Sequence, residues 1–154
     1  MGNNKKYNVY LAGALFNEAE VNQRKLEGKL LREAFGDKLD VYNPIDQPFN
    51  EDKQSLPTPA DIFKHDTDAV LASDFVLADV TNEDSGVMFE LGIAYQSNKY
   101  IIAINSDIRL ESANKYEVPS YSMNHYVLGG IEENGVLVRS FKEAIEELKR
   151  KIGC

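Results

Sequence analysis

The fold class can be inferred from residues 75–105, FVLADVTNEDSGVMFELGIAYQSNKYIIAIN. This stretch begins with a continuous apolar run at residues 75–80, which is typical of a strand buried on both faces of a parallel sheet. Residues 86–97 have the length and composition of a helix, and residues 100–105 form a second apolar run of strand length. A strand, a helix and a strand in this order predict a parallel sheet that is covered by helices.

The alternation of strands and helices continues on both sides of this stretch. Further strands are predicted at residues 7–14 and 39–42, and further helices at residues 17–35, 59–72 and 140–152. Two polar stretches, residues 43–59 and 106–122, are predicted to be long loops. We therefore expect one α/β domain over residues 1–154, with a flavodoxin-like (Rossmann-like) open parallel sheet of about five strands and helices on both faces.

The first predicted helix carries apolar residues at helical spacing, and we expect this stripe to face the core. The stripe consists of Leu26, Leu30, Leu31, Ala34 and Phe35.

Composition and charge exclude several classes of protein. The chain of 154 residues is 43% hydrophobic and 27% charged, which excludes a disordered chain. Its 17 Lys and Arg against 25 Asp and Glu give a net charge of −8, so nucleic acid and membrane surfaces are not expected partners. The single cysteine, Cys154, forms no intrachain disulfide, and no signal peptide or membrane span is recognised. We therefore expect a cytoplasmic protein.

The functional site is expected where the strands end, because ligands of open parallel sheets bind at the carboxyl edge. In this chain, the segments after Ala12, Tyr42, Val80 and Asn105 should build the site.

Three acidic residues stand out against their local pattern. Glu90 is the only charge among residues 88–95, and Asp66 falls on the apolar stripe of its helix. Asp84 precedes the helix that contains Glu90. Each has a structural explanation when taken alone. The Glu90 carboxylate could be satisfied by buried partners or by solvent, and Asp66 could lie at the edge of the stripe. Asp84 could be a helix cap. Asp79, at the end of a strand, could similarly hold the following loop.

Taken together, these acids predict a chemistry. Carboxylates that crowd one cleft can take different protonation states, and they can then divide the roles of nucleophile and acid. One can attack an anomeric carbon while another protonates the leaving group, which is the mechanism of retaining glycosyl transfer. Other chemistries find little support, because His65 and His125 lack zinc-ligand spacing and no dinucleotide, P-loop or serine-nucleophile motif is present. No metal and no cofactor are expected.

Beyond these acids, the sequence resembles the nucleoside 2-deoxyribosyltransferases from Val9 to about Gly130. The resemblance rests on VYLAGALF at residues 9–16, HDTDAVLASDFVLADV at 65–80, DSGVMFELGIAY at 84–95 and NHYVLG at 124–129. The second and third segments, with their spacing, are the most specific.

This resemblance implies a role for each of the acids. Glu90 falls at the position of the family's nucleophile, and Tyr10 falls at that of a first-strand tyrosine that orients the nucleophile. Asp66 and Asp84 fall at the positions of aspartates that contact the nucleobase and help to protonate it.

The resemblance also implies substrate contacts and an assembly. Phe16 falls at an aromatic position over the base, and Gln47 falls at that of a base-contacting glutamine. Asn124 falls at the position of a residue that a neighbouring subunit contributes to the sugar hydroxyl. We therefore expect a homo-oligomer built from dimers, with a hexamer as the expected assembly. Asp79 and Tyr126 complete the expected substrate-binding residues.

The activity implied by the resemblance is the transfer of 2-deoxyribose between purine or pyrimidine bases, through a covalent glutamyl-deoxyribosyl intermediate and with retention of configuration. The expected partners are 2′-deoxynucleosides and free nucleobases. Two alternatives remain open. One is a 2′-deoxynucleoside 5′-monophosphate N-hydrolase, which would need phosphate-binding groups around residues 13–18. The other is a non-catalytic nucleoside-binding protein. A phosphorylated receiver domain is disfavoured, because residues 12–14 supply no acidic pair.

Overall fold

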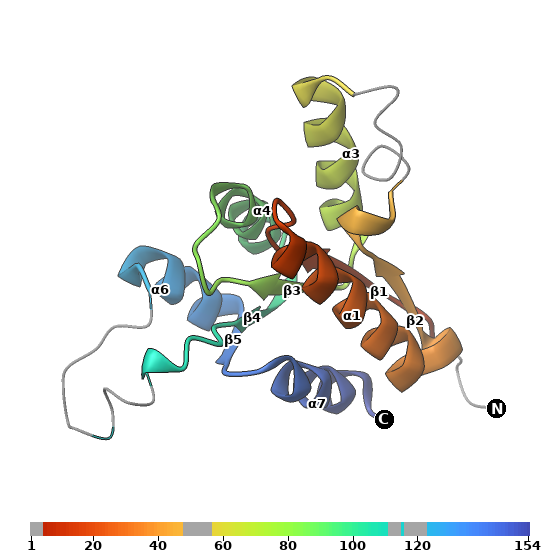
Figure 1. The fold of residues 1–154 in the computed structure, drawn as a ribbon. Helices are drawn as coiled ribbons and strands as arrows, with labels where there is room; N and C mark the ends of the chain where they lie inside the picture. Colours follow the sequence, from red (N-terminus) through yellow and green to blue (C-terminus); the bar gives the residue numbers. More distant parts are fainter. Residues whose placement is uncertain (1–4, 48–56, 111–114, 116–122) are drawn as a thin grey trace.

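The computed structural model of the protein describes residues 5–47, 57–110, 115 and 123–154. Its centre is a sheet of five parallel strands in the order β2-β1-β3-β4-β5 (Figure 1). The strands are β1 (Tyr7–Ala12), β2 (Leu39–Tyr42), β3 (Phe75–Asp79), β4 (Tyr100–Ile104) and β5 (Gly135–Val138). The predicted α/β class with an open parallel sheet is therefore confirmed.

Helices cover both faces of the sheet (Figure 1). One face carries α3 (Pro59–Ala72), α4 (Ser85–Gln96) and α6 (His125–Asn134), and the other carries α1 (Glu18–Phe35) and α7 (Phe141–Ile152). Successive side chains of β1 alternate between the two cores, because a strand points neighbouring residues to opposite faces. Tyr10 and Ala12 join the core beneath α3, α4 and α6, whereas Val9 and Leu11 join the core beneath α1 and α7. Since both faces are covered, residues 75–78 of β3 and 101–104 of β4 are all apolar.

Side chains at the helix starts satisfy backbone N–H groups that have no partner within the helix. These capping residues are Asn17 for α1, Thr58 for α3, Asp84 for α4, Asn124 for α6 and Ser140 for α7. Within the described ranges, no helix combines the length and the apolar character that a bilayer crossing requires.

Several element boundaries differ from the sequence-based predictions. β1 ends at Ala12 and not at residue 14. The predicted loop at residues 43–59 begins with a short 3₁₀ helix, η2 (Pro44–Asp46), and its residues 48–56 lie outside the described ones. In the second predicted loop, residues 111–114 and 116–122 also lie outside them. The helix α6 and the strand β5 have no counterpart among the predicted elements, although a sheet of about five strands was expected.

The predicted core-facing stripe of α1 is wrong at two positions. Leu26 is 46% exposed, and Ala34 is also exposed. The buried face of α1 instead consists of Arg24, Glu27, Gly28, Leu31 and Phe35. Two charged residues lie on this face because Arg24 forms ion pairs with both Glu27 and Asp79, which offset the cost of removing these charges from water.

Gly135 allows β5 to approach β4. A methyl group on Gly135 would lie 1.8 Å from the carbonyl oxygen of Ile101, and this oxygen belongs to the backbone and cannot swing aside. We expect Gly135→Ala to lower the free energy of unfolding by about 3 kcal/mol or more. The control Gly130→Ala adds a methyl group within α6 where nothing lies within 4 Å, and it should raise this free energy by about 0.5–1 kcal/mol. Chemical denaturation measures both variants, and equal stabilities would contradict this packing.

Candidate active site

Glu90 and Tyr10 meet between the sheet and α4. Tyr10 is fully buried in β1, and its side chain points to the face of the sheet that α4 covers. Glu90 lies in the second turn of α4. The Tyr10 hydroxyl donates a hydrogen bond of 2.6 Å to Oε1 of Glu90, which joins residues 80 positions apart in the chain. The structure thus brings together two residues for which the family resemblance implies a shared function.

The Glu90 carboxyl has an unusual protonation equilibrium. Burial raises its pKa to about 7, and the hydrogen bond from Tyr10 partly opposes this shift. The negative charges of Asp66 and Asp84 raise the pKa further, so these two carboxylates lie close enough to Glu90 to interact with it. Near neutral pH, Glu90 can therefore be present in both its ionised and its protonated form.

Asp66 is held by Tyr42, a residue that the sequence analysis did not single out as functional. Tyr42 is the last residue of β2, and its hydroxyl donates a hydrogen bond of 2.8 Å to Oδ1 of Asp66. Its ring stacks on that of Tyr10, with centroids 5.2 Å apart and an interplanar angle of 12°. Burial and the hydrogen bond to Asp66 raise the pKa of Tyr42, which keeps the hydroxyl protonated as a donor. The sequence offered one signal for Tyr42, which is its position at the end of a predicted strand, where the site was expected.

Asp84 begins the helix that carries Glu90. Its Oδ1 accepts a hydrogen bond of 3.1 Å from the backbone N–H of Val87, so Asp84 is the helix cap that the sequence suggests. The charge of Asp84 also raises the pKa of Glu90, so this cap lies near the Glu90 carboxyl, and its role toward the base stays a prediction. Within the described ranges, no group of three or more His, Cys, Asp or Glu side chains is arranged to hold a metal ion.

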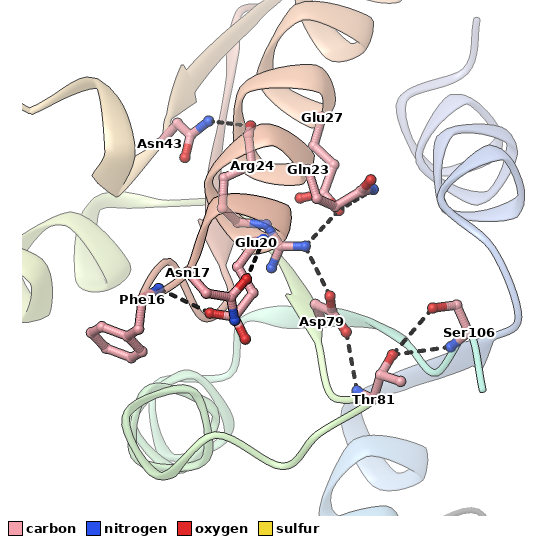
Figure 2. A network of polar contacts seen from close by, with 10 residues as sticks. All are labelled: Phe16, Asn17, Glu20, Gln23, Arg24, Glu27, Asn43, Asp79, Thr81 and Ser106. Carbon is pink, nitrogen blue, oxygen red and sulfur yellow. Dashed lines mark hydrogen bonds and ion pairs between the residues drawn. The ribbon is translucent and has the colours of Figure 1, made fainter.

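A second polar network lies beneath the turn between β1 and α1 (Figure 2). Arg24, which is buried, places Nη2 2.9 Å from Oε1 of Glu27 and 2.8 Å from Oδ2 of Asp79. Its guanidinium packs directly against Gly13, where a methyl group would lie only 1.5 Å from Nη1. Burial raises the pKa of Glu27 to about 7, although the charge of Arg24 opposes the shift. Neither Arg24 nor Glu27 was singled out from the sequence, because charged residues on a helix ordinarily face solvent.

Asp79 belongs to this network. Its Oδ2 binds Arg24, and its Oδ1 accepts a hydrogen bond of 3.0 Å from the backbone N–H of Thr81. Although burial opposes the change, the hydrogen bonds from Arg24 and Thr81 lower the pKa of Asp79. Asp79 therefore holds the loop that follows β3, the structural role considered for it from the sequence. Its contact with substrate stays a prediction.

Phe16 and Gln47 lie outside the hydrogen-bonded group of acids and tyrosines. The Phe16 side chain is 79% exposed, and Figure 2 shows its ring pointing away from Arg24 and Asp79. Gln47 donates a long hydrogen bond of 3.4 Å to the backbone oxygen of Asn43. In the part of the chain that the structure describes, neither residue forms a hydrogen bond with the three acids, and their contacts with a base stay predictions.

Asn124 and Tyr126 lie at the start of α6. Asn124 caps this helix through Oδ1, which accepts a hydrogen bond of 2.9 Å from the N–H of Tyr126, and its own backbone N–H donates to Glu83 at 2.7 Å. The Tyr126 side chain is 92% exposed. Their roles toward the substrate also stay predictions.

The chain is similar in sequence to one family and to a curated protein. It matches the family model described as nucleoside 2-deoxyribosyltransferase over residues 9–145. An uncharacterized protein of Ureaplasma parvum serovar 3 is 34% identical over 104 residues, which cover 63% of this chain. The chain spans 65% of the length of that relative.

Three solved structures resemble the fold. A conserved protein from Enterococcus faecalis V583 has a TM-score of 0.81 and 28% identity, covering 95% of this chain and 99% of the other. A 2-desoxiribosyltransferase from Leishmania mexicana has a TM-score of 0.68 and 18% identity, covering 94% and 97%. A CMP N-glycosidase from Clostridium botulinum has a TM-score of 0.58 and 19% identity, covering 94% and 98%. The last two support the fold alone.

The matched region, residues 9–145, contains both tyrosines and all three acids described above. The observed sheet and the sequence match agree over most of the chain. The chain therefore belongs to the nucleoside 2-deoxyribosyltransferase family, a family of enzymes that act on glycosyl bonds.

Proposed function

We propose that the protein is a nucleoside 2-deoxyribosyltransferase, which moves 2-deoxyribose from one nucleobase to another. The observation that carries this proposal is the 2.6 Å hydrogen bond between the Tyr10 hydroxyl and Oε1 of Glu90. A carboxylate held through one oxygen keeps its other oxygen, Oε2, for attack on carbon. Glycosyl transfer also requires an acid for the leaving group. Asp66 and Asp84, which interact with the Glu90 carboxyl, are the candidates for this role.

In the first half of the reaction, ionised Glu90 attacks C1′ of the donor from the side opposite the base. The transition state resembles an oxocarbenium ion, which forms more easily because the sugar lacks a 2′-hydroxyl. The electron pair of the glycosidic bond leaves with the base, and Asp66 or Asp84 in its protonated form gives the base a proton. The product is a 2-deoxyribosyl ester of Glu90.

In the second half, a nitrogen of an acceptor base attacks C1′ from the side that the first base vacated. The C1′–O bond of the ester breaks, and Glu90 leaves with its electron pair as a carboxylate. The proton that the attacking nitrogen loses goes to the aspartate. Two inversions retain the configuration at C1′, and the kinetics are ping-pong. Water would hydrolyse the ester, so the site must exclude it. The burial of Tyr10 and the partial burial of Glu90 serve this purpose.

The contacts of the first turn favour an uncharged nucleoside over a nucleotide. A phosphate would need free N–H groups or a free cation at this turn. The N–H of Phe16 instead donates to Oε2 of Glu20 at 2.9 Å, and Arg24 is bound by the two carboxylates of Glu27 and Asp79. These contacts disfavour a 2′-deoxynucleoside 5′-monophosphate N-hydrolase.

A second copy of the chain is proposed to complete the site. In the described structure, the hydrogen bonds of Asn124 are made with Glu83 and with the first turn of α6, and not with Asp66, Asp84 or Glu90. Large side chains on the helices of this face are exposed: Phe63 at 54%, Phe89 at 62% and Tyr126 at 92%. A groove of about 660 Å³ also lies between α4 and α6. Exposed apolar surface of this kind is typical of an interface, and a dimer-based homo-oligomer could bring Asn124 to the neighbouring site.

The nucleophile is tested by Glu90→Gln, which keeps the size of the side chain and removes its negative charge. We expect base exchange between deoxyinosine and adenine, followed by HPLC, to fall by roughly 1,000-fold or more. Glu147→Gln is the matched control, because Glu147 also accepts a tyrosine hydrogen bond, from Tyr100 at 2.7 Å, but lies in α7. Retention of most of the exchange rate by Glu90→Gln would falsify the assignment. In the wild type, faster release of base from deoxynucleoside monophosphates would favour the hydrolase, and binding without turnover would favour a nucleoside-binding protein.

The pH dependence follows from the pKa of Glu90. Attack requires the ionised form, so kcat/KM should rise with pH through about 7. Tyr10 stabilises the ionised form by its hydrogen bond, so Tyr10→Phe should raise the pKa of Glu90 and move this rise to higher pH. The measurement is a pH profile of kcat/KM for both proteins. An unchanged or lower midpoint in the variant would argue against this role of Tyr10.

A mixing experiment tests the contribution of Asn124 across subunits. Asn124→Ser keeps a residue that can cap α6, while it removes the amide. Glu90→Ala and Asn124→Ser should each be inactive alone. If Asn124 acts in the neighbouring subunit, random reassembly of a dimer should give about a quarter of the wild-type sites, each with both native residues. No recovery of activity after verified subunit exchange would count against a shared site.

A further inference from the structure

Three side chains form a continuous hydrogen-bonded path from solvent to Asp66, which interacts with Glu90. The Tyr42 hydroxyl lies 2.7 Å from Nδ1 of His65 and 2.8 Å from Oδ1 of Asp66. His65 and Asp66 are neighbours in α3, and the direct distance from Nδ1 to Oδ1 is 3.8 Å. The His65 side chain is 50% exposed, whereas that of Asp66 is 18% exposed. This hydrogen-bonded path therefore begins at a solvent-exposed side chain and ends at an acid of the candidate active site.

The hydrogen-bond geometry limits where the protons lie. A tyrosine hydroxyl has one hydrogen, so it can donate to only one of its two partners. When Asp66 is ionised, Tyr42 donates to it and Nδ1 of His65 must carry the hydrogen that faces Tyr42. When Asp66 is protonated, both bonds can reverse, with Asp66 donating to Tyr42 and Tyr42 donating to His65. All hydrogen bonds are formed in both arrangements. Two hydrogens shift between them, and the net result is the movement of one proton between His65 and Asp66.

The Tyr42 hydroxyl is held firmly in this position. Tyr42 and Tyr10 are paired residues of neighbouring parallel strands, and their rings are stacked with an interplanar angle of 12°. The sheet and the stacked ring therefore set the position of the Tyr42 hydroxyl, which in turn orients the carboxylate of Asp66.

We propose that Tyr42 and His65 are positioning residues that orient Asp66 and exchange its proton with solvent, so that Asp66 and not Asp84 protonates the leaving base. This inference rests on the proposed transferase function and adds an assignment of the acid.

The proton moves in balanced steps. In the imidazolium form of His65, the Nδ1–H bond breaks as a new O–H bond forms on Tyr42. The original O–H bond of Tyr42 breaks as an O–H bond forms on Oδ1 of Asp66. His65 becomes neutral and Asp66 becomes a carboxylic acid. When the base departs with the electron pair of the glycosidic bond, the O–H bond of Asp66 breaks and an N–H bond forms on the base. The acceptor base returns a proton to Asp66 by the reverse transfer.

The test compares two donors that differ in their need for an acid. Deoxyinosine needs a proton on its base, whereas N7-methyl-2′-deoxyguanosine carries a positive charge on its base, which leaves as a neutral molecule. Tyr42→Phe keeps the aromatic ring and removes the hydroxyl. We expect it to lower kcat with deoxyinosine by roughly 100-fold and to change kcat with the methylated donor by less than about 3-fold. His65→Ala should show the same pattern with a smaller loss, and its exposed position also makes it a safe second variant for folding.

The control is Tyr100→Phe, which removes another tyrosine hydroxyl that donates to a carboxylate, that of Glu147, outside the site. It should leave kcat unchanged with both donors. Equal losses with the two donors in Tyr42→Phe would show a merely structural role and overturn the inference, as would full activity of Tyr42→Phe with deoxyinosine. Those results leave the proposed function intact, whereas a wild-type protein without exchange activity would overturn both.

Discussion

The hydrogen bond between Tyr10 and Glu90 connects the most buried part of the sheet to a charged group. Removing a carboxylate from water costs free energy, and a short hydrogen bond from a fixed donor recovers part of that cost. The donor is fixed because β1 lies between β2 and β3, with Tyr10 paired to Tyr42 on one side and to Val76 on the other. The start of α4 is fixed in turn by the Asp84 cap, shortly after β3 ends. Small displacements of either element would separate the hydroxyl from the carboxylate.

The parallel sheet explains how residues far apart in sequence reach one place. Each strand delivers its last residues to the same edge, and the following helix begins there. Tyr10 and Tyr42 come from two adjacent strands, whereas Asp66 and Glu90 come from the helices that pack on the same face. The opposite core contributes differently, because Arg24 of α1 supports the first turn from beneath and uses Asp79 as its anchor. At this edge of the sheet, the candidate catalytic residues thus lie on the face that α3 and α4 cover, and the buried ion pairs of Arg24 lie on the face that α1 covers.

The parts of the fold that were predictable are those with a strong local pattern. The apolar runs of β3 and β4 and the helix between them follow from residues 75–105, since strands buried on both faces need no polar residues. β5 was not predicted although its residues, GVLV, are apolar, because this run is only four residues long and follows directly on α6. The stripe of α1 was misplaced at Leu26, because the burial of Arg24 depends on Asp79, 55 residues away in the chain.

The same limit applies to the site. The acids were noticed because each violates its local pattern, as Glu90 does among apolar neighbours in α4. Tyr42 violates nothing, since a tyrosine is an ordinary strand residue, and its contact with Asp66 arises only from the packing of α3 on the sheet. Residues of this kind can be recognised only once their neighbours in the three-dimensional structure are known.

The order of the strands places β2 and β5 at the two margins of the sheet, and each has only four residues. Short edge strands offer few free backbone groups to a strand of another molecule. This protects the protein against aggregation through sheet extension between molecules. Contacts between copies would then have to form through helix surfaces, where side chains and not backbone groups select the partner. Such contacts can be altered by single substitutions without disturbing the strand pairing, so this architecture lets the assembly change while the central sheet stays the same.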